Sequence, residues 1–135
     1  MFISQDSYEK DIRLSGLLYL HRITDNRSSR TPFKNFNMFQ NLCGIEAFKN
    51  VVLVTTMWDE VHEEEGRLRE RDLITSHWNT MIELGSRISR FYRTTESALD
   101  IVSQFQDAQC TVLLQKELVD QHLILVKTSA GRAYF

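Results

Sequence analysis

The side chains that most often hold metals or attack substrates are few in this chain, and they lack the spacing of the common sites. The four histidines include no H-E-x-x-H pair, and the two cysteines, Cys43 and Cys110, form no C-x-x-C. A zinc site needs three or four converging ligands, so this spacing does not indicate a metal held by side chains alone. Cys43 has no histidine near it in the sequence to act as a base. We therefore assign no catalytic residue and no metal ligand.

Three short polar segments could carry binding chemistry, and each follows an apolar run. The first begins at His21, the second covers residues 56–59, and the third covers residues 93–95. Arginines in the first segment could stabilise phosphate charge, and the carboxylate of Asp59 could accept hydrogen bonds from a ligand. Simpler roles stay open: a solvated loop for the first segment, and capping of the following helix for Asp59 and Thr94.

The elements that must position these segments alternate between strands and helices. Residues 14–20 and 51–55 are short, nearly continuous apolar runs, as in strands buried on both faces, and residues 87–91 form a weaker, alternating strand. Apolar residues at helical spacing predict helices over about 33–43, 61–82, 95–105 and 111–125. This alternation predicts an α/β fold with about three parallel strands and flanking helices. Ligands of such sheets bind beyond the carboxyl ends of the strands, where the three polar segments lie.

Composition and charge narrow the class of protein. The chain has 135 residues, with 16 Lys and Arg against 18 Asp and Glu and a formal net charge of -2. This balance excludes a strongly basic nucleic-acid binder. No apolar run approaches the ~20 residues that span a bilayer, and the opening residues lack the basic and apolar regions of a signal peptide. We expect a cytoplasmic protein with no membrane span and no nucleic-acid partner.

Several longer blocks of sequence are distinctive in themselves and in their order. They read LSGLLYLHRITDNR from Leu14, then LCG from Leu42, KNVVLVTTMWD from Lys49, RF from Arg90, ESA from Glu96 and QKELVD from Gln115. Together they resemble a fungal family of P-loop GTPase-like, G-domain-containing proteins. The resemblance extends over about residues 10–132.

The resemblance implies the carboxyl-terminal half of a G domain, with a partial P-loop NTPase-like three-layer fold. In that family a phosphate-binding loop, a switch segment and an Asp-x-x-Gly turn come before the strand at 14–20. This sequence contains no G-x-x-x-x-G-K-[ST] and no Asp followed three residues later by Gly. We divide the chain into a disordered or frayed segment at 1–13, the half domain at 14–126 and a flexible tail at 127–135. Whether the chain is an enzyme stays open.

The resemblance also implies which residues bind the nucleotide base. In G domains the second polar segment holds Asn/Thr-Lys-x-Asp, and its Asp accepts two hydrogen bonds from the guanine edge. Asp59 matches that Asp and Thr56 matches the first position, whereas Met57 replaces the Lys that covers the base. Thr94 lies in the loop that packs on the other side of the base. The implied ligand is GTP with Mg²⁺ in the complete domain, and no cofactor is expected for this chain alone.

Two functions follow for the chain. The first is a GTP-binding fragment that carries the guanine-recognition half, lacks the phosphate-binding loop and is inactive alone. The alternative is a non-catalytic α/β protein-interaction module derived from a GTPase. In a complete G domain, further strands lie beside residues 14–20 and 51–55. Without them strand edges and apolar faces lie open, so we expect a protein partner or self-association.

Overall fold

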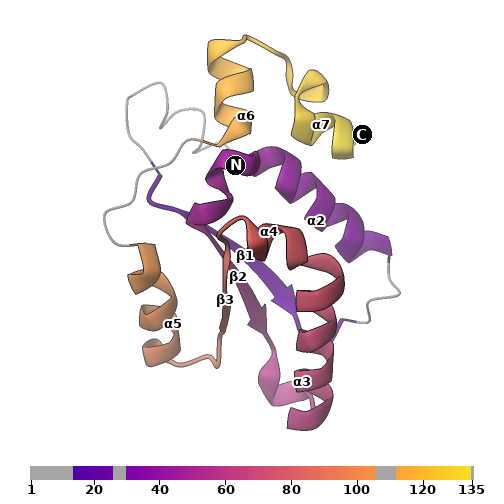
Figure 1. The fold of residues 1–135 in the computed structure, drawn as a ribbon, viewed down its shortest axis with the longest axis vertical. Helices are drawn as coiled ribbons and strands as arrows, with labels where there is room; N and C mark the ends of the chain where they lie inside the picture. The colour runs from indigo at the N-terminus through magenta and orange to yellow at the C-terminus, as the bar shows by residue number, and fades with distance from the viewer. Residues whose placement is uncertain (1–13, 26–29, 106–111, 135) are drawn as a thin grey trace.

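A three-stranded parallel sheet lies at the centre of the computed structural model, which describes residues 14–25, 30–105 and 112–134 (Figure 1). The strands are β1 (Leu17–Arg22), β2 (Val51–Thr56) and β3 (Arg87–Arg90), in the spatial order β1-β2-β3. Leu17 lies opposite Val51, and both pairings are parallel. The predicted parallel sheet is confirmed. The segment at 1–13, expected to be disordered or frayed, lies outside the described residues.

At least one helix follows each strand. None of the helices among the described residues is long and apolar enough to cross a membrane. The α-helices are α2 (Arg30–Cys43), α3 (Glu63–Asp72), α4 (Asn79–Glu83), α5 (Thr95–Val102), α6 (Leu113–Gln115) and α7 (Ser129–Tyr134). Two π-helical segments cover Leu73–His77 and Lys116–Asp120, and 3₁₀ turns cover Ile45–Asn50, Trp58–Glu60, Ser103–Phe105 and Leu125–Lys127.

The helices cover both faces of the sheet and produce three layers (Figure 1). On one face, α2 and the α3–α4 region pack against β1 and β2 in the main core, where the Tyr19 ring contacts the rings of Phe36 and Phe39. On the other face, α5 packs Ile101 against Val52, in a smaller cluster with Phe91 and Phe105. The central strand β2 is buried on both faces, as its β-branched run predicts.

The first strand is buried on one face only, which corrects the expectation of burial on both faces. Leu17 and Tyr19 pack against the main core, whereas the side chains of Leu18 and Leu20 are 42% and 62% exposed. The reason is that α5 packs against β2 and β3 and none of the described helices covers β1 on that face. The side chains of Leu18 and Leu20 thus form an open apolar face on this strand.

The helix predicted over 61–82 is divided by the π-helical segment. The N–H of Trp78 donates to the carbonyl of Leu73 at 2.7 Å, a bond that spans five residues instead of four. Residues five apart on an α-helix point about 140° away from one another, yet Leu73, Trp78 and Met81 are all buried in one core. The wider turn brings these three side chains to the same face.

The carboxyl-terminal part departs furthest from the prediction. The helix expected over 111–125 ends at Asp120, because His122 has a φ of 53° and the Leu123 N–H turns back to the Glu117 carbonyl at 2.8 Å. The tail expected at 127–135 contains α7, which lies beside α2 and buries Ala130 (Figure 1). The buried carboxylate of Glu117 accepts a hydrogen bond from the N–H at the start of α7 at 2.9 Å.

Candidate functional site

The loops that follow β2 and β3 enclose a hollow of about 360 Å³ at the carboxyl edge of the sheet. The two strands end side by side, since the N–H of Phe91 donates to the carbonyl of Thr55 at 2.9 Å just beyond β3. The lining includes Trp58, Asp59, Glu63, Arg90, Tyr92 and Arg93. This edge is where open α/β sheets bind ligands.

Arg90 fixes one wall of the hollow. Its guanidinium donates two hydrogen bonds to the Glu70 carboxylate, at 2.9 and 2.7 Å, and lies over the Trp58 ring at 4.1 Å. The indole N–H of Trp58 donates to the hydroxyl of Thr55 at 2.9 Å. Hydrogen bonding to Glu70 raises the pKa of Arg90 above its ordinary value. Arg90 therefore stays charged and ties α3, β3 and the loop after β2 together.

Asp59 and Arg93 are in contact with each other at the lining of the hollow. One guanidinium N–H of Arg93 donates to the Asp59 carboxylate at 3.3 Å, and both side chains are more than half exposed. Met57 and Arg93 both adopt left-handed backbone conformations, with φ of 65° and 61°. Such conformations cost non-glycine residues roughly 1–2 kcal/mol and often occur at functional sites. Of the described side chains, none caps the first turn of α3, so the capping alternative for Asp59 is not observed.

The other two predicted site residues lie at the ends of their elements. Among the described residues that line the hollow, Asp59 is present and Thr56 and Thr94 are absent. Thr56 ends β2, and its carbonyl accepts the Ile23 N–H at 2.9 Å. The Thr94 hydroxyl accepts a hydrogen bond from the Ser97 N–H at 3.1 Å, so Thr94 is the N-cap of α5. This is the capping role that the sequence analysis gave as the simpler alternative for Thr94.

Sequence reasoning missed Arg90 and Tyr92 as parts of this site. Tyr92 is half exposed, and its ring centroid lies 6.3 Å from that of Trp58. Both residues lie at the carboxyl end of the strand predicted over 87–91. Ligands of parallel sheets bind at that end, so their position could have indicated a role in the site.

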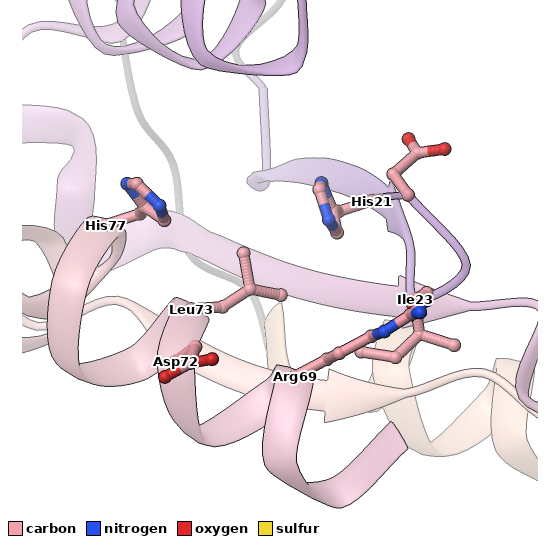
Figure 2. Close-up of a pocket in the computed structure, with 7 residues that line it drawn as sticks. His21, Ile23, Arg69, Asp72, Leu73 and His77 are labelled. Carbon is pink, nitrogen blue, oxygen red and sulfur yellow. Dashed lines mark hydrogen bonds between the residues drawn. The ribbon is translucent and has the colours of Figure 1, made fainter. Parts of the chain in front are cut away.

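A second, smaller cavity of about 150 Å³ lies at the carboxyl end of β1 (Figure 2). In Figure 2, His21 comes from β1 and His77 comes from the π-helical segment, and both side chains lie above Leu73 in the view. Burial lowers the pKa of His21, and the Nδ1 atom of His77 is buried with no hydrogen-bond partner among the described residues. The Arg69 guanidinium donates to two backbone carbonyls of the β1–α2 loop, both at 3.0 Å.

The second cavity combines a small volume with several polar side chains. A small polar cavity with an unsatisfied buried nitrogen is typical of a site for ordered water. Within the ranges that the structure describes, no group of three or more His, Cys, Asp or Glu side chains could hold a metal ion. The hollow around Asp59 is larger and presents a more accessible carboxylate, so it is the stronger candidate for ligand binding.

No family model matches this chain, and no curated protein matches it. We therefore infer function from the residues and the geometry of the two cavities described above.

Proposed function

We propose that this chain carries the guanine-recognition half of a GTP-binding G domain with a P-loop NTPase-like fold, and that the hollow around Asp59 receives the base. The observation that supports this proposal best is the position of Asp59. Its exposed carboxylate lies in a hollow of about 360 Å³ at the carboxyl edge of a parallel sheet. Hollows that bind small molecules measure roughly 300–1,000 Å³.

The chemistry of Asp59 suits guanine better than adenine. An ionised carboxylate only accepts hydrogen bonds. Guanine presents two neighbouring donors, the N1–H and the 2-amino group, whereas adenine has an unprotonated N1 and no 2-amino group. A site built on such pairing rejects a ligand that cannot complete it, because buried polar groups are then left unpaired. Asp59 thus provides the selectivity, and Thr56 and Thr94 support the two loops.

This sequence contains no phosphate-binding loop that would contact the phosphates of the nucleotide. P-loop enzymes gain most of their affinity and catalysis from backbone amides, a Lys and Mg²⁺ around the phosphates, and the sequence has no G-x-x-x-x-G-K-[ST]. Affinity for a guanine nucleotide should therefore be no better than about millimolar, or roughly -4 kcal/mol. GTP with Mg²⁺ is the ligand of a complete domain, and this chain alone hydrolyses none.

A second function, non-catalytic protein binding, is favoured by β1. Leu18 and Leu20 are exposed on one face of this strand, and β1 lies at one edge of the sheet in the described residues. Open edges and apolar faces commonly mark contact with another chain. Light scattering and dye binding test this function independently of nucleotide.

Nuclear magnetic resonance titration with GMP and AMP tests the guanine proposal, since it reports millimolar affinities. We expect GMP to bind at about millimolar concentration, AMP to bind more weakly, and Asp59→Asn to bind both equally. Asp100→Asn is the matched control, because Asp100 is an exposed aspartate on α5 away from the hollow. Equal binding of GMP and AMP to the unmodified chain would refute the proposal, as would an unchanged preference in Asp59→Asn.

A further inference from the structure

We propose that Arg93 is a built-in competitor of guanine, which occupies Asp59 when the site is empty and leaves it when the base binds. This inference rests on the proposed function. Its basis is the contact between the Arg93 guanidinium and the Asp59 carboxylate at 3.3 Å, which joins residues 34 positions apart in the sequence. The contact brings together the loops that follow β2 and β3.

The guanidinium and the guanine edge offer the same chemistry to a carboxylate. An arginine side chain presents N–H donors in a planar fork that matches carboxylate oxygens. The N1–H and 2-amino group of guanine form a similar pair of neighbouring donors in one plane. The base and Arg93 therefore compete for the same oxygen atoms of Asp59.

Two arginines line the hollow, and their surroundings give them different roles. Arg90 is held by two hydrogen bonds to Glu70, by one to the Tyr92 hydroxyl and by the Trp58 ring, so its displacement would break four contacts. Among the described residues, the Arg93 guanidinium makes a single hydrogen bond, to Asp59, and its side chain is 62% exposed. Arg93 is thus the displaceable cation, and Arg90 is the fixed one.

The exposure of the pair sets the size of the effect. Exposed ion pairs are weak, so release of Arg93 reduces guanine affinity by at most about fivefold. The competitor should affect adenine binding less, because adenine lacks the paired N1–H and 2-amino donors that guanine offers to Asp59. Removal of the guanidinium should therefore raise the preference for GMP over AMP about two- to fivefold. A change in the general charge of the hollow would affect both nucleotides alike, so the ratio of the two affinities isolates the competition.

The experiment compares the dissociation constants of GMP and AMP for the unmodified chain, Arg93→Ala and Arg93→Lys. We expect the preference for GMP to rise about two- to fivefold in Arg93→Ala and to stay closer to the original value in Arg93→Lys, which keeps a cation. In an Asp59→Asn background, Arg93→Ala should give no gain. Arg67→Ala is the matched control, since Arg67 forms an exposed pair with Glu64 on α3, away from the hollow.

The other outcomes separate this inference from the function on which it rests. If the unmodified chain prefers GMP through Asp59 but Arg93→Ala leaves that preference unchanged or lowers it, Arg93 is not a competitor and the guanine site stands. If neither the unmodified chain nor Arg93→Ala prefers GMP, both proposals are overturned.

Discussion

Replacement of Glu70 by Gln should destabilise the fold far more than the same change at Glu64. Both carboxylates belong to α3 and each contacts an arginine at 2.7 Å, but the two pairs differ in burial. In the Arg90–Glu70 pair the side chains are 29% and 17% exposed, against 51% and 69% for Arg67 and Glu64. Because the two ion pairs have the same N···O distance, burial of the side chains is the difference that the comparison tests.

The magnitude follows from what each substitution leaves behind. Glu70→Gln removes one carboxylate that accepts two hydrogen bonds and leaves the half-buried Arg90 guanidinium short of a partner. Hydrogen bonds to charged groups contribute about 1.5–3 kcal/mol, and breaking a fully buried pair costs about 3–5 kcal/mol. For this partly buried pair we expect a loss of about 1–3 kcal/mol in the free energy of unfolding. Glu64→Gln should have no measurable effect, because water already solvates both partners.

Urea denaturation followed by circular dichroism measures both changes. With a slope of about 1–3 kcal/mol per molar urea, a loss of 2 kcal/mol lowers the midpoint by about 1 M. Trp58 fluorescence should shift in Glu70→Gln, because Arg90 no longer holds the indole ring. Equal urea midpoints for Glu70→Gln and Glu64→Gln would refute the view that the Arg90 anchor stabilises this wall of the hollow.

Three further predictions concern other parts of the chain. Burial depresses the pKa of His21 below its ordinary value, so the stability that it contributes should be full above about pH 6.5 and fall as the pH drops below that value. The urea midpoints of His21→Gln should show less of this fall. Leu20→Glu should reduce light scattering and hydrophobic-dye binding, and a compact, dye-silent monomer in the unmodified chain would contradict an open β1 face. Thermal unfolding of Thr94→Ala should show a loss of about 1 kcal/mol, largely restored in Thr94→Ser, if Thr94 caps α5.

The strands could be predicted from the sequence because their signal is local. The run from Val51 to Thr55 is apolar and β-branched, and such a run is stable mainly as a buried central strand. Likewise, Thr94 precedes an apolar pattern with helical spacing, and the structure places it as the N-cap of α5. The order of these elements was sufficient to predict a parallel sheet.

The features that escaped prediction depend on tertiary packing and contacts that no local pattern shows. The π-helical segment exists because Leu73 and Trp78 share one core, which no local pattern reveals. Helix α7 begins where Glu117, twelve residues away, accepts the Ser129 N–H. At the candidate site, sequence reasoning found Asp59 but not its contact with Arg93. The loops that carry the two residues contain left-handed backbone conformations at Met57 and Arg93, which are uncommon for residues other than glycine.

The most direct test of the guanine site is to map amide shifts of the isotope-labelled chain during titration with GMP. The proposed site predicts that the amides of Asp59, Tyr92 and Arg93 shift together, and that equal AMP shifts them much less. Shifts centred on His21 and His77 would instead place the ligand in the second cavity, at the end of β1. That result, or equal shifts with GMP and AMP, would contradict recognition of guanine by Asp59.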